Sequence, residues 1–280
     1  MDHRTPENDA QLTDVWTIFD GLPLLYRRNA TEPPAGARTI LHLHGFGISG
    51  RYLLPTAALL ASDYRTIVPD LPGFGRSHHP RRRLTIPWLG DVVVRLMDQL
   101  EIDRAILLSN SLGAPITGAV IDTHPDRVEA AILVSPAGGE YNLPFPKALA
   151  QLALAGSREP LGMLPIAARD YARFGVRSSL ALLRSMLAYP AAERVREFTL
   201  PTLVVIGSRD PLVGEGHVAE VAVELPHVTA VVIEGASHAI NFSHPEQLAH
   251  VVREWLAGKP ITADPTAKGA IRVFEMPRGG

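Results

Sequence analysis

The sequence of 280 residues contains no cysteine. This absence excludes disulfide bonds, zinc–thiolate sites, iron–sulfur clusters and a cysteine nucleophile. Any chemistry that this chain performs must therefore use other side chains.

The sequence also lacks long apolar runs. No stretch approaches the roughly 18 consecutive apolar residues that a membrane-spanning helix needs. Residues Met1 to Gln11 are polar and show neither the basic start nor the apolar run of a secretory signal. We therefore expect a soluble, cytoplasmic protein that does not insert into membranes.

An excess of charge of one sign is missing too. The chain carries 27 Lys and Arg against 29 Asp and Glu, for a formal net charge of -2. Such a balance gives no electrostatic case for binding nucleic acid or an anionic membrane surface. With 46% hydrophobic and 20% charged residues, the composition is that of a globular protein.

Segments with the pattern of buried strands alternate with segments of helical periodicity. Strands are predicted at residues 16–20, 24–28, 38–44, 64–70, 105–109, 130–135, 202–206 and 229–233, with a further short one at 271–274. Helices are predicted at residues 88–100, 112–124, 217–225 and 245–257. This alternation predicts an α/β fold, with a mostly parallel central sheet, helices on both faces and ligand chemistry at the carboxyl ends of the strands.

The alternation stops between residues 137 and 198. There Leu, Ala, Arg and several Pro have helical spacing without a strand signal, as at residues 147–155 and 178–188. We therefore predict a core formed by residues 1–136 and 199–258, a helical insertion at 137–198 and a C-terminal tail at 259–280.

One predicted strand end has the pattern of a nucleophile elbow. In Ser109-Asn110-Ser111-Leu112-Gly113 a serine lies between a strand and a helix, with small residues two positions before and after it. So tight a turn strains its central residue and leaves no room for bulky neighbours, a requirement that Ser109 and Gly113 meet. Ser111 is therefore the candidate nucleophile.

A serine hydroxyl needs a base to take its proton and a carboxylate to orient that base. His238 and Asp210 follow later predicted strands, in Gly235-Ala236-Ser237-His238 and Gly207-Ser208-Arg209-Asp210. The order serine, acid, histidine is typical of this kind of fold. We predict His238 as the base and Asp210 as the acid, with Glu215 as the nearest alternative acid.

These motifs, together with His44-Gly45-Phe46-Gly47 and Asp70-Leu71-Pro72-Gly73-Phe74-Gly75-Arg76-Ser77, resemble those of the α/β-hydrolase family. The resemblance spans roughly residues 14–257 and departs from the family at Ser109, where glycine is usual. It implies an oxyanion hole formed by the backbone N–H groups of Phe46 and Leu112, with Gly47 as the fallback for Phe46. It also implies that the insertion is a cap over an apolar pocket.

The expected activity is therefore hydrolysis of a carboxylic ester of a fairly apolar small molecule through an acyl-enzyme on Ser111, with thioesters and lactones as close alternatives. Such chemistry needs no cofactor and no metal. A cap helix could mediate a homodimer.

Three other readings stay open. Ser135-Pro136-Ala137-Gly138-Gly139 is similar to a segment of ring-cleavage-product hydrolases, which cleave a carbon–carbon bond of a diketone, although Ala239 replaces the aromatic residue expected after the histidine. A ligand-binding receptor on a hydrolase fold would keep the same residues with little turnover. Residues 45–50 also match the G-x-G-x-x-G dinucleotide pattern, with Asp70 as the ribose ligand, but this reading leaves Ser111 unexplained.

Overall fold

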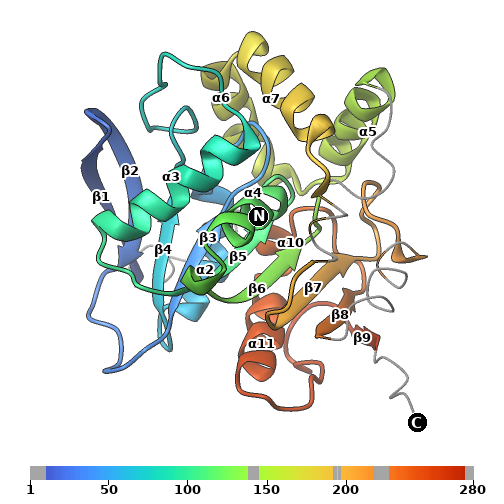
Figure 1. Ribbon diagram of the computed structural model, residues 1–280. Coiled ribbons are helices and arrows are strands. Elements are labelled where there is room, and N and C mark those ends of the chain that lie inside the picture. Colours follow the sequence, from blue (N-terminus) through green and yellow to red (C-terminus); the bar gives the residue numbers. More distant parts are fainter. Residues whose placement is uncertain are drawn as a thin grey trace.

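The computed structural model describes residues 11–137, 145–191, 194, 197–216, 218 and 227–274. A nine-stranded sheet with the order β1-β2-β4-β3-β5-β6-β7-β8-β9 runs through its centre (Figure 1). The strands are β1 (Leu12–Phe19), β2 (Leu22–Asn29), β3 (Thr39–Leu43), β4 (Arg65–Pro69), β5 (Ala105–Asn110), β6 (Val128–Val134), β7 (Thr202–Gly207), β8 (Val228–Ile233) and β9 (Ile271–Phe274).

The central strands are parallel. Every neighbouring pair from β4 across to β8 is parallel, whereas β1, β2 and β9 pair antiparallel at the two edges. The predicted mostly parallel sheet is therefore confirmed.

The opening hairpin has a tighter turn than the sequence suggested. β1 and β2 are joined by Asp20 and Gly21 alone, and both have positive φ angles, of 49° and 75°. A two-residue turn with two positive φ angles matches the right-handed twist of the flanking strands. Leu22, which lies between the strands predicted at 16–20 and 24–28, already pairs with Phe19 in the ladder.

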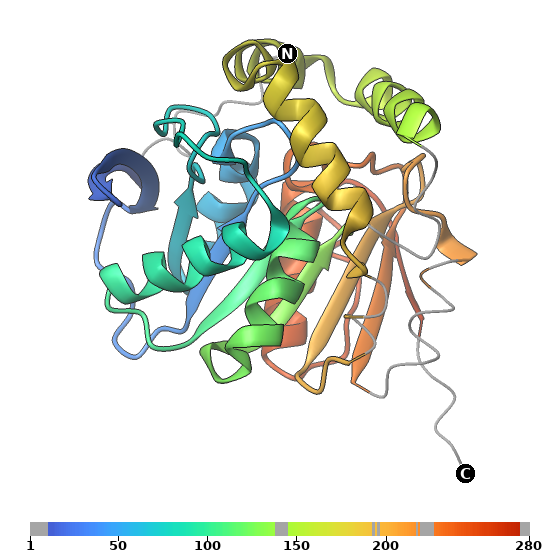
Figure 2. The same cartoon turned by 45° about the horizontal axis from the view of Figure 1, so that its top comes forward.

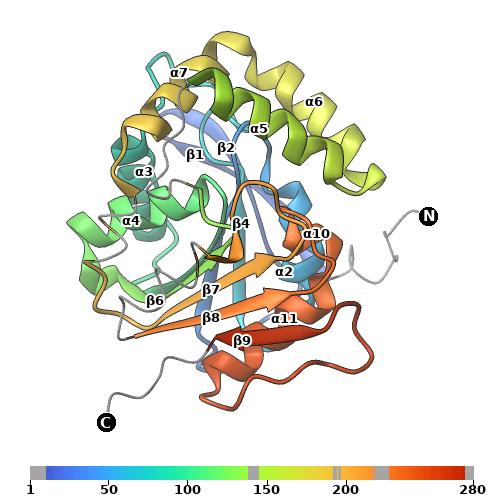
Figure 3. The same ribbon diagram turned by 90° about the vertical axis from the view of Figure 1, so that its right-hand side faces the viewer.

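Helices cover both faces of the sheet, as predicted (Figures 1 and 3). One face carries α3 (Ile86–Gln99) and α4 (Gly113–Thr123), followed by the short η2 (Pro125–Arg127). The other face carries α2 (Leu54–Leu60), α10 (Ile240–Ser243) and α11 (Pro245–Leu256), with η1 (Gly50–Leu53) leading into α2.

The two faces bury alternate residues of the same strands. Leu107 of β5 belongs to the hydrophobic cluster that contains α3 and α4, whereas its neighbours Ile106 and Leu108 belong to the cluster that contains α11. Successive side chains of a strand point to opposite faces of the sheet. A strand that is covered on both faces therefore has apolar residues at consecutive positions in the sequence. The central strands are therefore packed from both sides.

The insertion forms helices α5 (Phe145–Arg158), α6 (Leu164–Phe174) and α7 (Val176–Ala188), with η3 (Leu161–Met163) before α6. They form a separate layer over one end of the sheet (Figures 2 and 3). The segments predicted at 147–155 and 178–188 are helical, and α6 adds a helix that we did not single out. The boundaries at 136/137 and 198/199 stay a prediction.

Two predictions concern the C-terminal part. The helix predicted at residues 217–225 lies outside the described residues, apart from Val218. Residues 271–274 form β9, which pairs with β8 and therefore brings part of the predicted tail into the sheet.

Over the described ranges, no helix combines the length and the apolar character that crossing a bilayer requires.

Asp70 is a buried structural centre at the end of β4. Its carboxylate accepts hydrogen bonds from the Arg27 guanidinium and from the backbone N–H groups of Gly50 and Arg76, both at 3.0 Å. Ser77 donates to the Asp70 carbonyl at 2.6 Å and thereby closes the loop. Because both carboxylate oxygens are engaged inside the fold, Asp70 is not free to bind a ribose, contrary to the dinucleotide reading.

Replacing Asp70 should destabilise the fold strongly. Arg27 is only 5% exposed, so Asp70→Ala leaves its buried guanidinium with the half-exposed Asp14 as its remaining carboxylate partner, at a cost of about 3–5 kcal/mol in the free energy of unfolding. Urea titration of both proteins measures this difference. The matched control is Asp63→Ala, which breaks the exposed pair with Arg253 and should cost no more than about 1 kcal/mol. Equal losses in the two variants would contradict this role of Asp70.

Candidate active site

Ser111 lies on a sharp turn between β5 and α4. Its φ angle is 54°, in the left-handed region that non-glycine residues rarely adopt. A Cβ atom on Gly113 would lie 2.6 Å from the Leu43 carbonyl oxygen and 2.9 Å from the Ser109 Cβ. The structure therefore has the strained turn and the close packing that the sequence predicted.

His238 and Asp210 meet beside this turn. Asp210 follows β7 and His238 follows β8, and the Nδ1 atom of His238 lies 2.9 Å from Oδ2 of Asp210. The other oxygen of Asp210 accepts the Leu212 N–H at 2.8 Å. Glu215, the alternative acid, instead binds Arg272 at 2.6 Å.

The contact sets the charge state of both groups. Burial lowers the pKa of His238, but the charge and hydrogen bond of Asp210, together with the charge of Glu159, outweigh burial and raise this pKa above its usual value. Burial raises the pKa of Asp210, yet the charge and hydrogen bond of His238 bring it below its usual value. An ionised Asp210 can only accept, so Nδ1 carries a proton and Nε2 is left to accept one.

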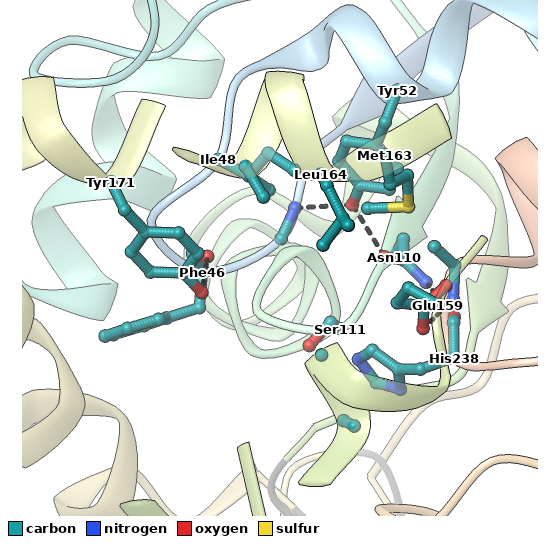
Figure 4. Close-up of a pocket in the computed structure, with 15 residues that line it drawn as sticks. Phe46, Ile48, Tyr52, Asn110, Ser111, Glu159, Met163, Leu164, Tyr171 and His238 are labelled. Atoms are coloured by element: carbon teal, nitrogen blue, oxygen red, sulfur yellow. Dashed lines mark hydrogen bonds between the residues drawn. The ribbon is translucent and has the colours of Figure 1, made fainter. Parts of the chain in front are cut away.

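Ser111 and His238 share the wall of one cavity (Figure 4). The cavity lies between the core and helices α5 and α6, and its volume is about 620 Å³ when the open solvent at its mouth is included. Its polar groups are few, and its other lining residues are small or apolar: Gly45, Phe46, Ile48, Ala155, Gly156, Met163, Leu164, Ala167 and Ala239.

Of the two predicted oxyanion donors, Leu112 directly follows Ser111 and Phe46 lines the same cavity as Ser111. In the described part of the chain, the N–H groups of Phe46 and Leu112 have no protein acceptor. The Gly45 N–H, in contrast, donates to the Tyr52 hydroxyl at 2.8 Å. Tyr171 of α6 donates to the Phe46 carbonyl at 3.1 Å, and its ring packs so closely on Gly47 that an added Cβ there would lie 2.4 Å from it.

Asn110 and Tyr52 join three loops of the site, and the sequence analysis assigned a role to neither. The Tyr52 hydroxyl donates to Oδ1 of Asn110 at 2.6 Å. The Asn110 amide donates in turn to the carbonyl oxygens of Val134 and His238, at 3.1 and 3.2 Å. Asn110 lies within the elbow pattern, whereas no sequence signal distinguishes Tyr52 from an ordinary core residue.

His44, after β3, makes structural hydrogen bonds, and His42 is buried within β3. Nε2 of His44 accepts the Leu71 N–H at 3.1 Å, so its Nδ1 carries the proton and donates to the Gly45 carbonyl at 3.0 Å. Burial lowers the pKa of His42 to about 3, which keeps that ring neutral. Among the described residues, no group of three or more His, Asp or Glu is placed to hold a metal ion.

Sequence comparison places the chain in a family. The model of the alpha/beta hydrolase family matches residues 40–251. This is well over half of the 280 residues, and the chain therefore belongs to the alpha/beta hydrolase family. The expected family and fold class are thus confirmed.

Relatives with assigned activities include several hydrolases. A pimeloyl-[acyl-carrier protein] methyl ester esterase of Aeromonas salmonicida is 32% identical over 75% of this chain and 92% of its own length. A 2-hydroxy-6-oxononadienedioate/2-hydroxy-6-oxononatrienedioate hydrolase of Cupriavidus pinatubonensis is 25% identical over 86% of this chain and 93% of its own length. The solved enol-lactonase of Burkholderia xenovorans shares the fold, with a TM-score of 0.70 at 24% identity over 87% of this chain and 100% of that one. The relatives of this chain therefore support hydrolase activity for it.

The tight turn gives a stability prediction. Gly113→Ala should destabilise the protein by about 1–3 kcal/mol, because its Cβ would press on the backbone of Leu43 and on Ser109. Gly118→Ala in the same helix is the control. A Cβ there finds its nearest atom at 3.5 Å, and alanine should stabilise the helix by up to about 1 kcal/mol. Chemical unfolding measures both changes, and a harmless Gly113→Ala would contradict the packing argument.

Proposed function

We propose that the protein is a serine hydrolase that cleaves a carboxylic ester of a fairly apolar small molecule through an acyl-enzyme on Ser111. The observation that carries this proposal is the shared cavity, in which the strained Ser111 lies beside a histidine that is bonded to a buried aspartate. Thioesters and lactones remain close alternatives, because this arrangement does not select the leaving group.

In this mechanism the Ser111 oxygen attacks the carbonyl carbon while Nε2 of His238 takes its proton. Asp210 holds the ring through Nδ1 and stabilises the imidazolium that forms. The N–H groups of Phe46 and Leu112 face the developing oxyanion. His238 then protonates the leaving group, and a water molecule, activated by the same histidine, releases the acid from Ser111.

The cavity supports an apolar acyl or aromatic group in the substrate. Ile48, Met163 and Leu164 line it together with Phe46, so that a hydrocarbon segment would leave water on binding. The relation to esterases of acyl-carrier-protein methyl esters is compatible with such a substrate.

Carbon–carbon bond hydrolysis of a diketone is the second candidate. Its support is the relation to the dienedioate hydrolase of Cupriavidus pinatubonensis. Against it, Ala239 rather than an aromatic residue follows His238. Turnover of a vinylogous diketone ring-cleavage product, at a rate above that of any ester, would favour this candidate.

Loss of the Ser111 hydroxyl should abolish turnover. We expect wild-type protein to hydrolyse p-nitrophenyl esters and Ser111→Ala to lose at least about 1,000-fold in kcat. A fluorophosphonate probe followed by mass spectrometry should label Ser111. The control is Ser62→Ala, an exposed serine outside the cavity. Activity in Ser111→Ala, together with a Ser111 that the probe does not label in the wild type, would reject the mechanism. Wild-type protein that binds the ester once without turning it over would favour the ligand-binding receptor.

The pKa of His238 predicts the pH profile. Because this pKa is raised and the neutral ring is the base, kcat/KM should fall as the pH drops through a value above about 6.5. Asp210→Asn removes the charge that raises the pKa, so its acid limb should move to lower pH while kcat falls by about 100-fold to 10,000-fold. Rate measurements from pH 5 to 9 test both, and an unmoved limb in Asp210→Asn would contradict the assignment.

A further inference from the structure

The cap contributes one carboxylate to the loop that carries His238. Glu159 directly follows α5, and its Oε2 atom accepts the Ser237 hydroxyl at 2.8 Å. Its Oε1 atom accepts the Ala239 N–H at 3.1 Å. One side chain of the cap therefore binds the residues immediately before and after His238.

The surroundings of Glu159 strengthen its hydrogen bonds to Ser237 and Ala239. The side chain lines the largely apolar cavity that also contains Ser111 and His238 (Figure 4). Burial raises its pKa, an effect that the Ser237 hydroxyl and the charge of His238 partly offset. Among the described residues, the other titratable groups around this corner include Asp210, Tyr52 and Tyr171. Hydrogen bonds to a carboxylate are stronger in such a setting than in water.

His238 is consequently held from three directions. Asp210 binds its ring and the Asn110 amide binds its carbonyl oxygen at 3.2 Å, both from the core. Glu159 holds the flanking residues from the cap. The loop after β8 contains Gly235, with a φ angle of 78°, so its path is not fixed by regular secondary structure.

We propose that Glu159 is a positioning residue that sets the orientation of His238 from the cap and adds negative charge beside its ring. This assignment rests on the proposed function, in which His238 is the base. It gives the cap a part in forming the catalytic geometry in addition to covering the substrate. A displacement of about 1 Å in such a group can cost about 100-fold in rate.

Two substitutions separate the hydrogen bonds from the charge. Glu159→Gln keeps an oxygen acceptor for the Ala239 N–H and an amide that can bind the Ser237 hydroxyl, but it removes the charge. Glu159→Ala removes both. We expect kcat to fall by less than about tenfold in Glu159→Gln and by up to about 100-fold in Glu159→Ala, with KM changing far less than kcat. In both variants the acid limb of kcat/KM should move to lower pH.

Asp170→Asn is the matched control, because Asp170 is another buried cap carboxylate that binds the core. It accepts the Ser49 N–H at 2.8 Å and does not contact the His238 loop. Its substitution removes a negative charge from the cap and perturbs a cap–core contact, so we expect the acid limb to stay at its wild-type position. Thermal melting of all variants identifies any loss that comes from unfolding alone.

An NMR titration of the His238 ring, assigned with His238→Gln, tests the proposal independently of turnover. The His238 pKa should be lower in Glu159→Gln than in the wild type and unchanged in Asp170→Asn. An unchanged pKa with wild-type kcat in Glu159→Ala overturns the role of Glu159. If the wild type neither turns over esters nor labels at Ser111, the proposed hydrolase function fails, whereas an active wild type with unaltered Glu159 variants rejects the Glu159 proposal alone.

Discussion

The left-handed turn at Ser111 is the constraint on which the candidate site depends. A φ angle of 54° in a serine costs about 1–3 kcal/mol and persists only when the surrounding structure enforces it. Here the Ser111 N–H donates to the Val134 carbonyl at 3.1 Å, and Gly113 lets α4 approach Leu43. The stability of the doubly covered sheet therefore maintains Ser111, in the wall of the cavity, in a conformation that an isolated peptide would leave.

The same turn organises the loops around it. Asn110, the residue before Ser111, is bonded to the Tyr52 hydroxyl on one side and to the His238 carbonyl on the other. Tyr52 also accepts the Gly45 N–H next to Phe46. Loops that follow different strands are therefore linked through uncharged hydrogen bonds in a buried region, where an unpaired group would be costly. Their relative positions are fixed before any ligand binds.

The succession of strands and helices along the chain could be predicted from the sequence, because apolar runs and glycine-rich strand ends are local signals. It also placed Ser111, Asp210 and His238 directly after predicted strands, and the structure brings the last two into contact. It could not supply Tyr52 or Glu159, whose partners lie 58 and 78–80 positions away and which have no motif of their own. It also misplaced the first turn, since the positive φ angles of Asp20 and Gly21 depend on strand twist.

The last strand of the sheet has a protective effect. β9 covers the outer side of β8, whose buried residues, such as Val231 and Ile233, are strongly apolar. A chain that ended near Gly258 would keep the cavity residues but would present the backbone donors and acceptors of β8 to solvent. Such open edges recruit strands from other molecules. β9 thus closes one edge of the sheet, and shortening the protein before it would promote self-association through β8.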